Sequence, residues 1–280
     1  MSSTLTVRQP TSSRRLDRSG PQARSDAEAK HIVLLVHGYN NTPKIAERSY
    51  RNILEKLGLP PHYAVWQLLW PSTHPLGAIS LATYPARVPA AENCGWLVAE
   101  KFISTLGRER TVYIVAHSLG CRLVLDAIKW IREHPSPDLP HIAGVFLLAA
   151  AVPVRMCVLH GEAPFRRPLP NSKEYVFYSG RDFALSVGFR PGQYLLGDPN
   201  ERGPAVGRHG HPSVGRWNGR KGTKLGHSSY WRSETVAGEI KTILGIRTTT
   251  VLESSELASH ELDEASGPAA RALPERHIGS

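Results

Sequence analysis

The sequence predicts an α/β fold in which a mostly parallel sheet is flanked by helices. Short apolar runs alternate with amphipathic stretches along the middle of the chain, a pattern typical of parallel strands joined by crossover helices. With 280 residues, of which 41% are hydrophobic and 21% charged, the chain is long enough for one such domain with a buried core. We expect this domain over residues 30–247, between a disordered leader (1–29) and a flexible tail (248–280).

Five runs are predicted strands because they are short and continuously apolar, as expected of strands buried on both faces. They cover residues 31–36, 65–69, 112–116, 144–149 and 175–179. Helical spacing or helix-start signals mark four further stretches, residues 45–57, 92–106, 119–133 and 233–244. No insertion is large enough for a separate cap domain. Residues 71–91 and 154–172 are expected to form short lids over an open cleft.

The composition argues against several classes of protein. No apolar run reaches the roughly 18 residues that a membrane-spanning helix needs, and the N-terminus lacks the apolar core of a secretory signal. Its Arg and Ser content leaves an organelle transit peptide as an alternative, but its acidic residues favour a plain leader. The three cysteines, Cys94, Cys121 and Cys157, have no CxxC spacing and suit no disulfide framework. A reducing, cytoplasmic location is therefore expected.

The net charge of +10 raises the question of an anionic partner. The arginines are scattered, and no recognition motif accompanies them, so no specific nucleic-acid partner is expected. The densest basic stretch, residues 202–224, is interpreted first as a solvated loop and second as a patch for anionic substrates.

Ser118 lies between an apolar strand and an amphipathic helix, with Ala116 and Gly120 two residues to either side. A nucleophile elbow needs small residues at these positions because its turn is sharp and strained. The turn also places Ser118 at a helix N-terminus, where free N–H groups favour developing negative charge. The pattern predicts a nucleophilic serine. The alternative is a serine that caps the helix of an ordinary strand-to-helix turn.

The first predicted strand ends in Val36-His37-Gly38-Tyr39. A glycine just past a strand lets the backbone turn toward the nucleophile. We expect the N–H groups of Tyr39 and Leu119 to form an oxyanion hole. An ordinary turn after a strand is the alternative explanation of His37-Gly38.

The acid and base of a serine hydrolase follow the nucleophile in the order Ser, Asp, His when the fold is of the α/β-hydrolase type. Asp182 follows the fifth predicted strand and a glycine turn, and is the expected acid. Asp198, in a loop rich in Gly and Pro, is the weaker alternative. Of the thirteen histidines, His227 lies in a loop just before the last helix and is the expected base. No cluster has metal-ligand spacing, so neither metal nor cofactor is expected.

Several motifs together resemble a group of bacterial α/β-hydrolases of unassigned function whose first clear strand ends in HGYNN. The matching pieces are VHGYNNT (36–42), WPS (70–72), AHSLG (116–120), residues 179–182 and GHSSYW (226–231). The resemblance implies the α/β-hydrolase fold and an esterase or lipase-like activity. It also carries over Ser118, Asp182 and His227 as a triad, with Tyr39 and Leu119 as oxyanion donors.

Aromatic residues that follow the predicted strands are candidates for an acyl pocket, although aromatic residues at such places usually belong to the core. The candidates are Trp66, Trp70, Tyr84 and Phe165. The sequence thus predicts a serine hydrolase that cleaves a small-molecule carboxylic ester through an acyl-enzyme intermediate. A thioesterase or acyltransferase using the same serine is one alternative. The other is a non-catalytic protein of this fold that binds anionic partners.

Overall fold

The computed structural model describes residues 3–8, 15–19, 29–73, 81–159, 161–210 and 217–246. The chain divides into two units, Met1–Ile246 and Arg247–Ser280. The first unit is built on one sheet, and the second, which includes the predicted tail, lies outside the described residues.

The sheet has eight strands in the order β2-β1-β4-β3-β5-β6-β7-β8. The strands are β1 (Ser3–Arg8), β2 (Arg15–Ser19), β3 (His31–Val36), β4 (Tyr63–Leu69), β5 (Thr111–His117), β6 (His141–Leu148), β7 (Lys173–Tyr178) and β8 (Gly219–Gly222). Only the β1–β2 pair is antiparallel, and the other neighbours are parallel. The predicted parallel α/β sheet is therefore confirmed, and the five predicted strands correspond to β3 through β7.

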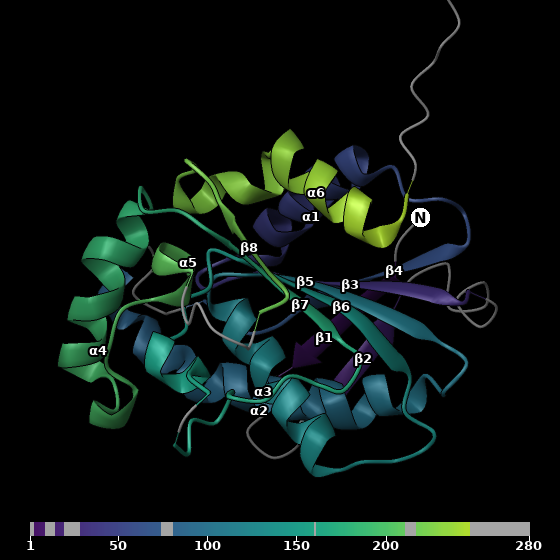
Figure 1. Ribbon diagram of the computed structural model, residues 1–280, viewed down its shortest axis with the longest axis horizontal. Coiled ribbons are helices and arrows are strands. Elements are labelled where there is room, and N and C mark those ends of the chain that lie inside the picture. Colours follow the sequence, from purple (N-terminus) through teal and green to yellow (C-terminus); the bar gives the residue numbers. More distant parts are fainter. Residues whose placement is uncertain are drawn as a thin grey trace, which may run out of the picture. The chain divides into compact units, whose positions relative to one another are not determined.

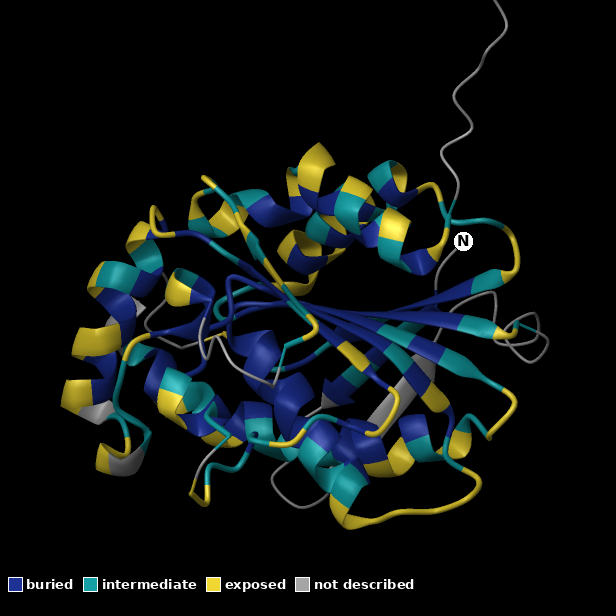
Figure 2. Ribbon diagram, viewed as in Figure 1, coloured by how far each residue is buried: buried dark blue, intermediate teal, exposed yellow. Residues whose placement is uncertain are grey.

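Helices cover both faces of the sheet. Figure 1 shows α1 (Pro43–Leu57) and α6 (Glu234–Leu244) on one face, with α2 (Val88–Lys101) and α3 (Leu119–Glu133) on the other. The central strands between them are almost fully buried (Figure 2). Helix α1 begins where the Thr42 side chain accepts a hydrogen bond from the Ile45 N–H, and it ends at Gly58 in the left-handed conformation. Both are common devices for satisfying helix ends.

Two strands lie where the sequence predicts a disordered leader. Leu5 and Val7 of β1 are buried, and β1 pairs in parallel with β4. Short strands near a sheet edge depend on hydrogen bonds to their neighbours, so their own residue pattern is a weak signal. The predicted basic loop, residues 202–224, likewise contains α5 (Val206–His209) and β8. The sequence of β8, GRKG, has no apolar residue to indicate a strand.

Between β7 and α5 the chain forms a π-helical turn, Leu185–Phe189, followed directly by α4 (Arg190–Leu196) and a 3₁₀ turn, Pro199–Glu201. This helical stretch was not predicted because it contains Gly188, Pro191 and Gly192, residue types that usually interrupt helices. The described residues contain no separate cap domain, in agreement with the prediction. Within them, no helix combines the length and the apolar character needed to cross a membrane.

Candidate active site

The residues with candidate roles converge at the carboxyl edge of the parallel sheet. His37 and Gly38 follow β3, Ser118 follows β5, and Asp182 follows β7. Neighbouring parallel strands end side by side, since Val36 of β3 pairs with Ala116 of β5. His227 begins the 3₁₀ turn His227–Arg232 just before α6. Ligand sites of open α/β sheets lie at this edge.

The backbone at Ser118 is strained in the manner of a nucleophile elbow. Ser118 has φ 54° and ψ −124°, a region that non-glycine residues rarely occupy. A Cβ on Gly38 would lie 2.7 Å from the Ser118 Cβ, and a Cβ on Gly120 would collide with the His37 carbonyl. These two glycines provide the space for the turn, and Ala116 is accommodated at the end of β5.

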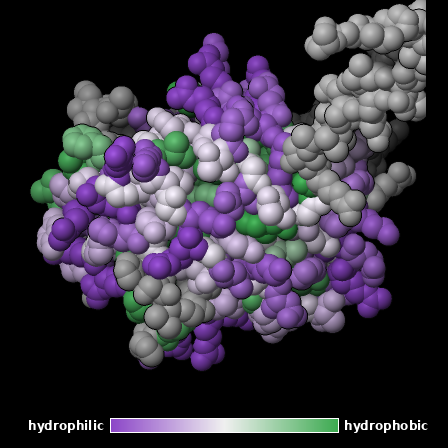
Figure 3. All heavy atoms as spheres, turned by 45° about the horizontal axis from the view of Figure 1, so that its top comes forward, coloured by the Kyte–Doolittle hydropathy of each residue, from purple (hydrophilic) through white to green (hydrophobic). Residues whose placement is uncertain are grey.

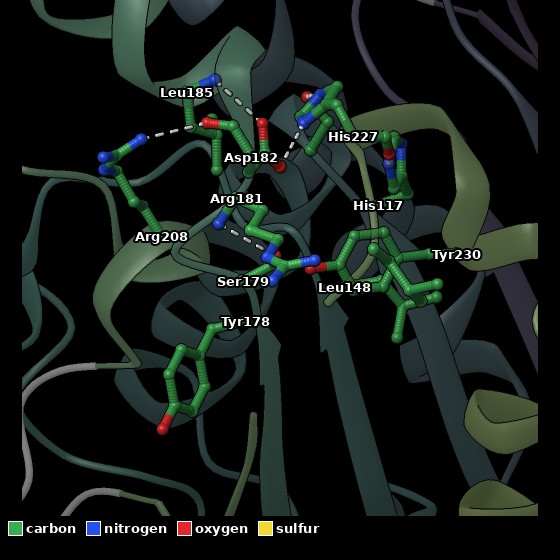
Figure 4. A network of polar contacts seen from close by, with 12 residues as sticks. His117, Leu148, Tyr178, Ser179, Arg181, Asp182, Leu185, Arg208, His227 and Tyr230 are labelled. Atoms are coloured by element: carbon green, nitrogen blue, oxygen red, sulfur yellow. Dashed lines mark hydrogen bonds and ion pairs between the residues drawn. The ribbon is translucent and has the colours of Figure 1, made fainter. Parts of the chain in front are cut away.

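The side chains of Ser118, His227 and Asp182 form a continuous chain of hydrogen bonds. His227 Nε2 lies 2.9 Å from Ser118 Oγ, and His227 Nδ1 lies 2.8 Å from Asp182 Oδ2. Because a carboxylate only accepts, Nδ1 carries the proton, and Nε2 is left to accept the Ser118 hydroxyl proton. Figure 4 shows the His227 ring directed at Asp182, with His117 beside it.

Asp182 is fully buried, and each of its carboxylate oxygens has a partner. Oδ1 accepts the Leu185 N–H at 2.9 Å, while Oδ2 faces His227. The backbone carbonyl of Asp182 accepts a hydrogen bond from the Arg208 guanidinium (Figure 4). The weaker alternative, Asp198, is exposed and lies beyond α4, where it borders a second cavity instead of this site.

His117 and His37 are buried and play structural roles around the triad. Burial lowers the pKa of His117 to about 3 and that of His37 to about 4, so both rings are neutral near pH 7. His117 Nε2 donates to the backbone carbonyl of His227 at 2.7 Å. The His37 ring donates to the Gly38 carbonyl and stacks on Trp70.

A cavity of about 290 Å³ opens beside Ser118. Tyr39 and Leu119, the expected oxyanion donors, both line it together with His227. Leu119 is the first residue of α3, so its N–H is one of those that no intrahelical carbonyl can satisfy. The backbone at Tyr39 and the backbone at Leu119 therefore both border the cavity in which an oxyanion at Ser118 would form.

Of the aromatic candidates for an acyl pocket, one lines the cavity and three lie in the core. Tyr84 lines the cavity and stacks on Phe189 with ring centroids 5.0 Å apart. Trp70 and Phe165 are not among the residues that line this cavity. The Trp70 indole N–H donates to the His37 carbonyl inside the core, and Phe165 is buried beneath the Arg122 guanidinium. Trp66 packs in the core against Phe102.

One wall of the cavity was not predicted from the sequence: it is formed by Ala184 and by Leu185 and Phe189 of the π-helical turn. Of the two expected lids, the described residues of 154–172 do not border this cavity, whereas 71–91 contributes Tyr84. The apolar residues at 185 and 189, four apart, were the available signal.

A buried ion-pair cluster joins α3 to the segment that follows α4. The Arg122 guanidinium contacts Asp126 at 2.9 Å and binds Glu201 through two hydrogen bonds of 2.9 and 3.0 Å. Burial raises the pKa of Asp126 to about 7, against the attraction of Arg122. Burial disfavours the Arg122 charge, but the nearby carboxylates raise its pKa above the ordinary value. The cluster borders the second cavity, of about 250 Å³, which shares Tyr84 and Ala151 with the first.

The described residues hold no group of three or more His, Cys, Asp or Glu side chains that could bind a metal ion. Cys94, Cys121 and Cys157 are free and buried.

Comparison with known proteins places the chain in a family. The model of a family described as alpha/beta hydrolase of unknown function (DUF900) matches residues 22–244. None of the curated proteins is significantly similar in sequence.

The chain is also similar to solved structures, including the following three. The esterase E25 is 13% identical with a TM-score of 0.46, and the match covers 86% of this chain and 77% of that one. A type II thioesterase from the yersiniabactin pathway, YbtT, is 9% identical with a TM-score of 0.42, covering 78% and 92%. XC6422 from Xanthomonas campestris, titled an a/b serine hydrolase without lid, is 9% identical with a TM-score of 0.38, covering 86% of each chain.

Proposed function

We propose that this chain, which belongs to the family of α/β-hydrolases of unknown function (DUF900), is a serine hydrolase that cleaves carboxylic esters. The observation that carries the proposal is the hydrogen-bonded series from Ser118 Oγ to His227 Nε2, and from His227 Nδ1 to Asp182 Oδ2. A nucleophile, a base and an orienting acid in this geometry suit acyl transfer. The cavity of about 290 Å³ beside Ser118 suits a modest ester.

In the first half of the proposed reaction, the Ser118 hydroxyl proton moves to His227 Nε2 as Oγ attacks the ester carbonyl carbon. The carbonyl oxygen becomes an oxyanion, which accepts hydrogen bonds from the N–H groups of Tyr39 and Leu119. The bond between the carbonyl carbon and the alkoxy oxygen then breaks. The alcohol leaves with the proton from Nε2, and the acyl group remains on Ser118.

In the second half, His227 Nε2 takes a proton from water, and the resulting hydroxide attacks the acyl-enzyme. Nε2 returns a proton to Ser118 Oγ as the carboxylic acid leaves. Asp182 holds Nδ1–H throughout and stabilises the imidazolium. An alcohol or thiol acceptor in place of water would give acyl transfer, and a thioester donor would give a thioesterase.

Labelling with a fluorophosphonate probe tests the proposal, because the probe reacts with activated serines. We expect the wild type to be labelled and to hydrolyse p-nitrophenyl acetate, and Ser118→Ala to lose both properties. Ser228→Ala, which changes an exposed serine, is the matched control and should retain both. Turnover that survives Ser118→Ala, or a folded wild type that neither labels nor turns over, would refute the proposal.

A further inference from the structure

Four of the five exposed large apolar side chains in the described residues lie in one short stretch. Leu195 and Phe183 are 73% and 71% exposed, Tyr194 is 59% exposed and Val187 44% exposed. We call residues 183–195 the apolar segment. Figure 3 shows hydrophobic side chains at the surface on the left of the view, the side where Figure 1 places α4. Ile45 on α1, 48% exposed, is the other exposed large apolar residue of the described chain.

The opposite face of the apolar segment forms a wall of the cavity that holds Ser118. Leu185 and Phe189 are buried and line that cavity, and Phe189 stacks on Tyr84. The segment therefore carries apolar side chains on two faces, one lining the cavity and the other exposed. A ligand held on its outer face would lie across the segment from the cavity.

Two exposed arginines accompany the segment. Arg181 precedes the segment and Arg190 lies within it, and both are exposed. Of the nearby carboxylates, Asp182 is buried against His227 and Glu201 is bound to Arg122, while Asp198 is exposed. The chain as a whole carries a net charge of +10. The face thus combines apolar side chains with cations, as in helices that lie in an anionic membrane surface.

The area of the face argues against a second copy of this chain as its occupant. Four partly exposed side chains present on the order of 400 Å², whereas a stable interface buries about 800 Å² on each partner. A lipid surface has no such requirement, because each apolar side chain gains from entering it independently. Arginine near such a surface adds attraction to anionic headgroups.

We propose that the apolar segment docks this chain on an anionic lipid surface and brings the cavity of Ser118 against it. The inference rests on the proposed ester hydrolysis and specifies its substrate class as water-insoluble acyl esters held in that surface. Phe183 and Leu195 enter the apolar layer, while Arg181 and Arg190 contact the headgroup phosphates. The acyl ester then reaches Ser118 past Leu185 and Phe189.

Co-sedimentation with vesicles of equimolar phosphatidylcholine and phosphatidylglycerol tests docking separately from catalysis, because it is performed on the full chain with Ser118→Ala. Phe183→Ser/Leu195→Ser should lower the partition coefficient by on the order of tenfold or more. Ile45→Ser, which removes an exposed apolar side chain outside the segment, should leave it unchanged. Arg181→Gln/Arg190→Gln should weaken binding to the mixed vesicles and leave binding to pure phosphatidylcholine unaffected.

A second readout is hydrolysis of p-nitrophenyl acetate in solution by the same variants with Ser118 restored. Retained rates show that Phe183→Ser/Leu195→Ser has kept the site intact, so its lower vesicle binding then supports docking. No sedimentation of the parent protein, or equal sedimentation of this double variant and Ile45→Ser, overturns the docking proposal. Self-association through the segment without vesicle binding also overturns it. Vesicle binding by a wild type that no fluorophosphonate labels would refute the proposed function instead.

Discussion

Replacing Gly38 by alanine places a methyl group between the turn after β3 and the nucleophile elbow. The new Cβ would lie 2.7 Å from the Ser118 Cβ, 3.0 Å from His117 Nδ1 and 3.1 Å from the His117 carbonyl oxygen. Ordinary contact begins at 3.4 Å, so all three atoms are too close. His117 and Ser118 are buried, and neither can move away without shifting the elbow.

The size of the effect follows from the displacement required. Relieving the contact with Ser118 moves either the serine or the Tyr39 turn by several tenths of an ångström, and a displacement of about 1 Å at a catalytic group can cost roughly 10²-fold in rate. We expect kcat/KM for p-nitrophenyl acetate to fall by about 10- to 100-fold in Gly38→Ala. Overpacking a buried site typically lowers the free energy of unfolding by about 1–3 kcal/mol.

Gly238→Ala is the matched control, since a Cβ at this position in α6 meets nothing within 4 Å. It should raise the free energy of unfolding by roughly 0.5–1 kcal/mol, as is usual for this exchange inside a helix, and leave kcat/KM unchanged. Urea denaturation and initial rates measure both variants. If Gly38→Ala were as stable and as active as the wild type, the packing assigned to the elbow would be wrong.

Three further predictions concern the acid, the anchor of the base and the buried ion pair. Asp182→Asn should reduce kcat by about 10⁴-fold while circular dichroism stays unchanged, because an amide does not enforce the required tautomer; a loss below tenfold would remove Asp182 from its role. His117→Phe keeps a ring but removes the N–H that holds the His227 carbonyl, so kcat should fall by on the order of 10²-fold, and an unchanged kcat would contradict this positioning. Burial raises the pKa of Asp126 from 3.8 to about 7, so the folded chain binds a proton that the unfolded chain has released. Stability from this group is full below about pH 4 and is lost as the pH rises through about 7. Asp126→Asn should flatten the dependence of the free energy of unfolding on pH, as measured by urea denaturation. An equal pH dependence in both proteins would contradict the raised pKa of Asp126.

Ser118 and Asp182 could be predicted from the sequence because each follows the end of a strand. Ser118 lies at a sharp turn flanked by small residues, and Asp182 follows a strand and a glycine. The edge of a parallel sheet collects such residues whatever their separation along the chain. His227 lies 45 residues beyond Asp182, and only its place before the last helix distinguished it from the other histidines.

The residues on the substrate side of the cavity were harder to predict, because no local sequence pattern identifies them. Trp70 and Phe165 follow strands as pocket residues do, yet tertiary packing takes both into the core. The apolar segment contains glycine and proline, which suppress a helix prediction even though its residues continue one helical path. Strand β8 is stabilised by its pairing with β7, and its own residues have little tendency to form a strand.

Two consecutive residues hold His227. The His117 side chain binds its main-chain carbonyl, and the Ser118 side chain binds its ring. Ser118 and His227, the proposed nucleophile and base, are thereby tied to the same strand end, although His227 lies 45 residues beyond Asp182 along the chain. The apolar segment touches the Asp182 carboxylate through one hydrogen bond, from the Leu185 N–H. A displacement of the apolar segment would therefore reach the Ser118–His227 pair by two routes, the Asp182 carboxylate and the cavity wall that Leu185 and Phe189 form.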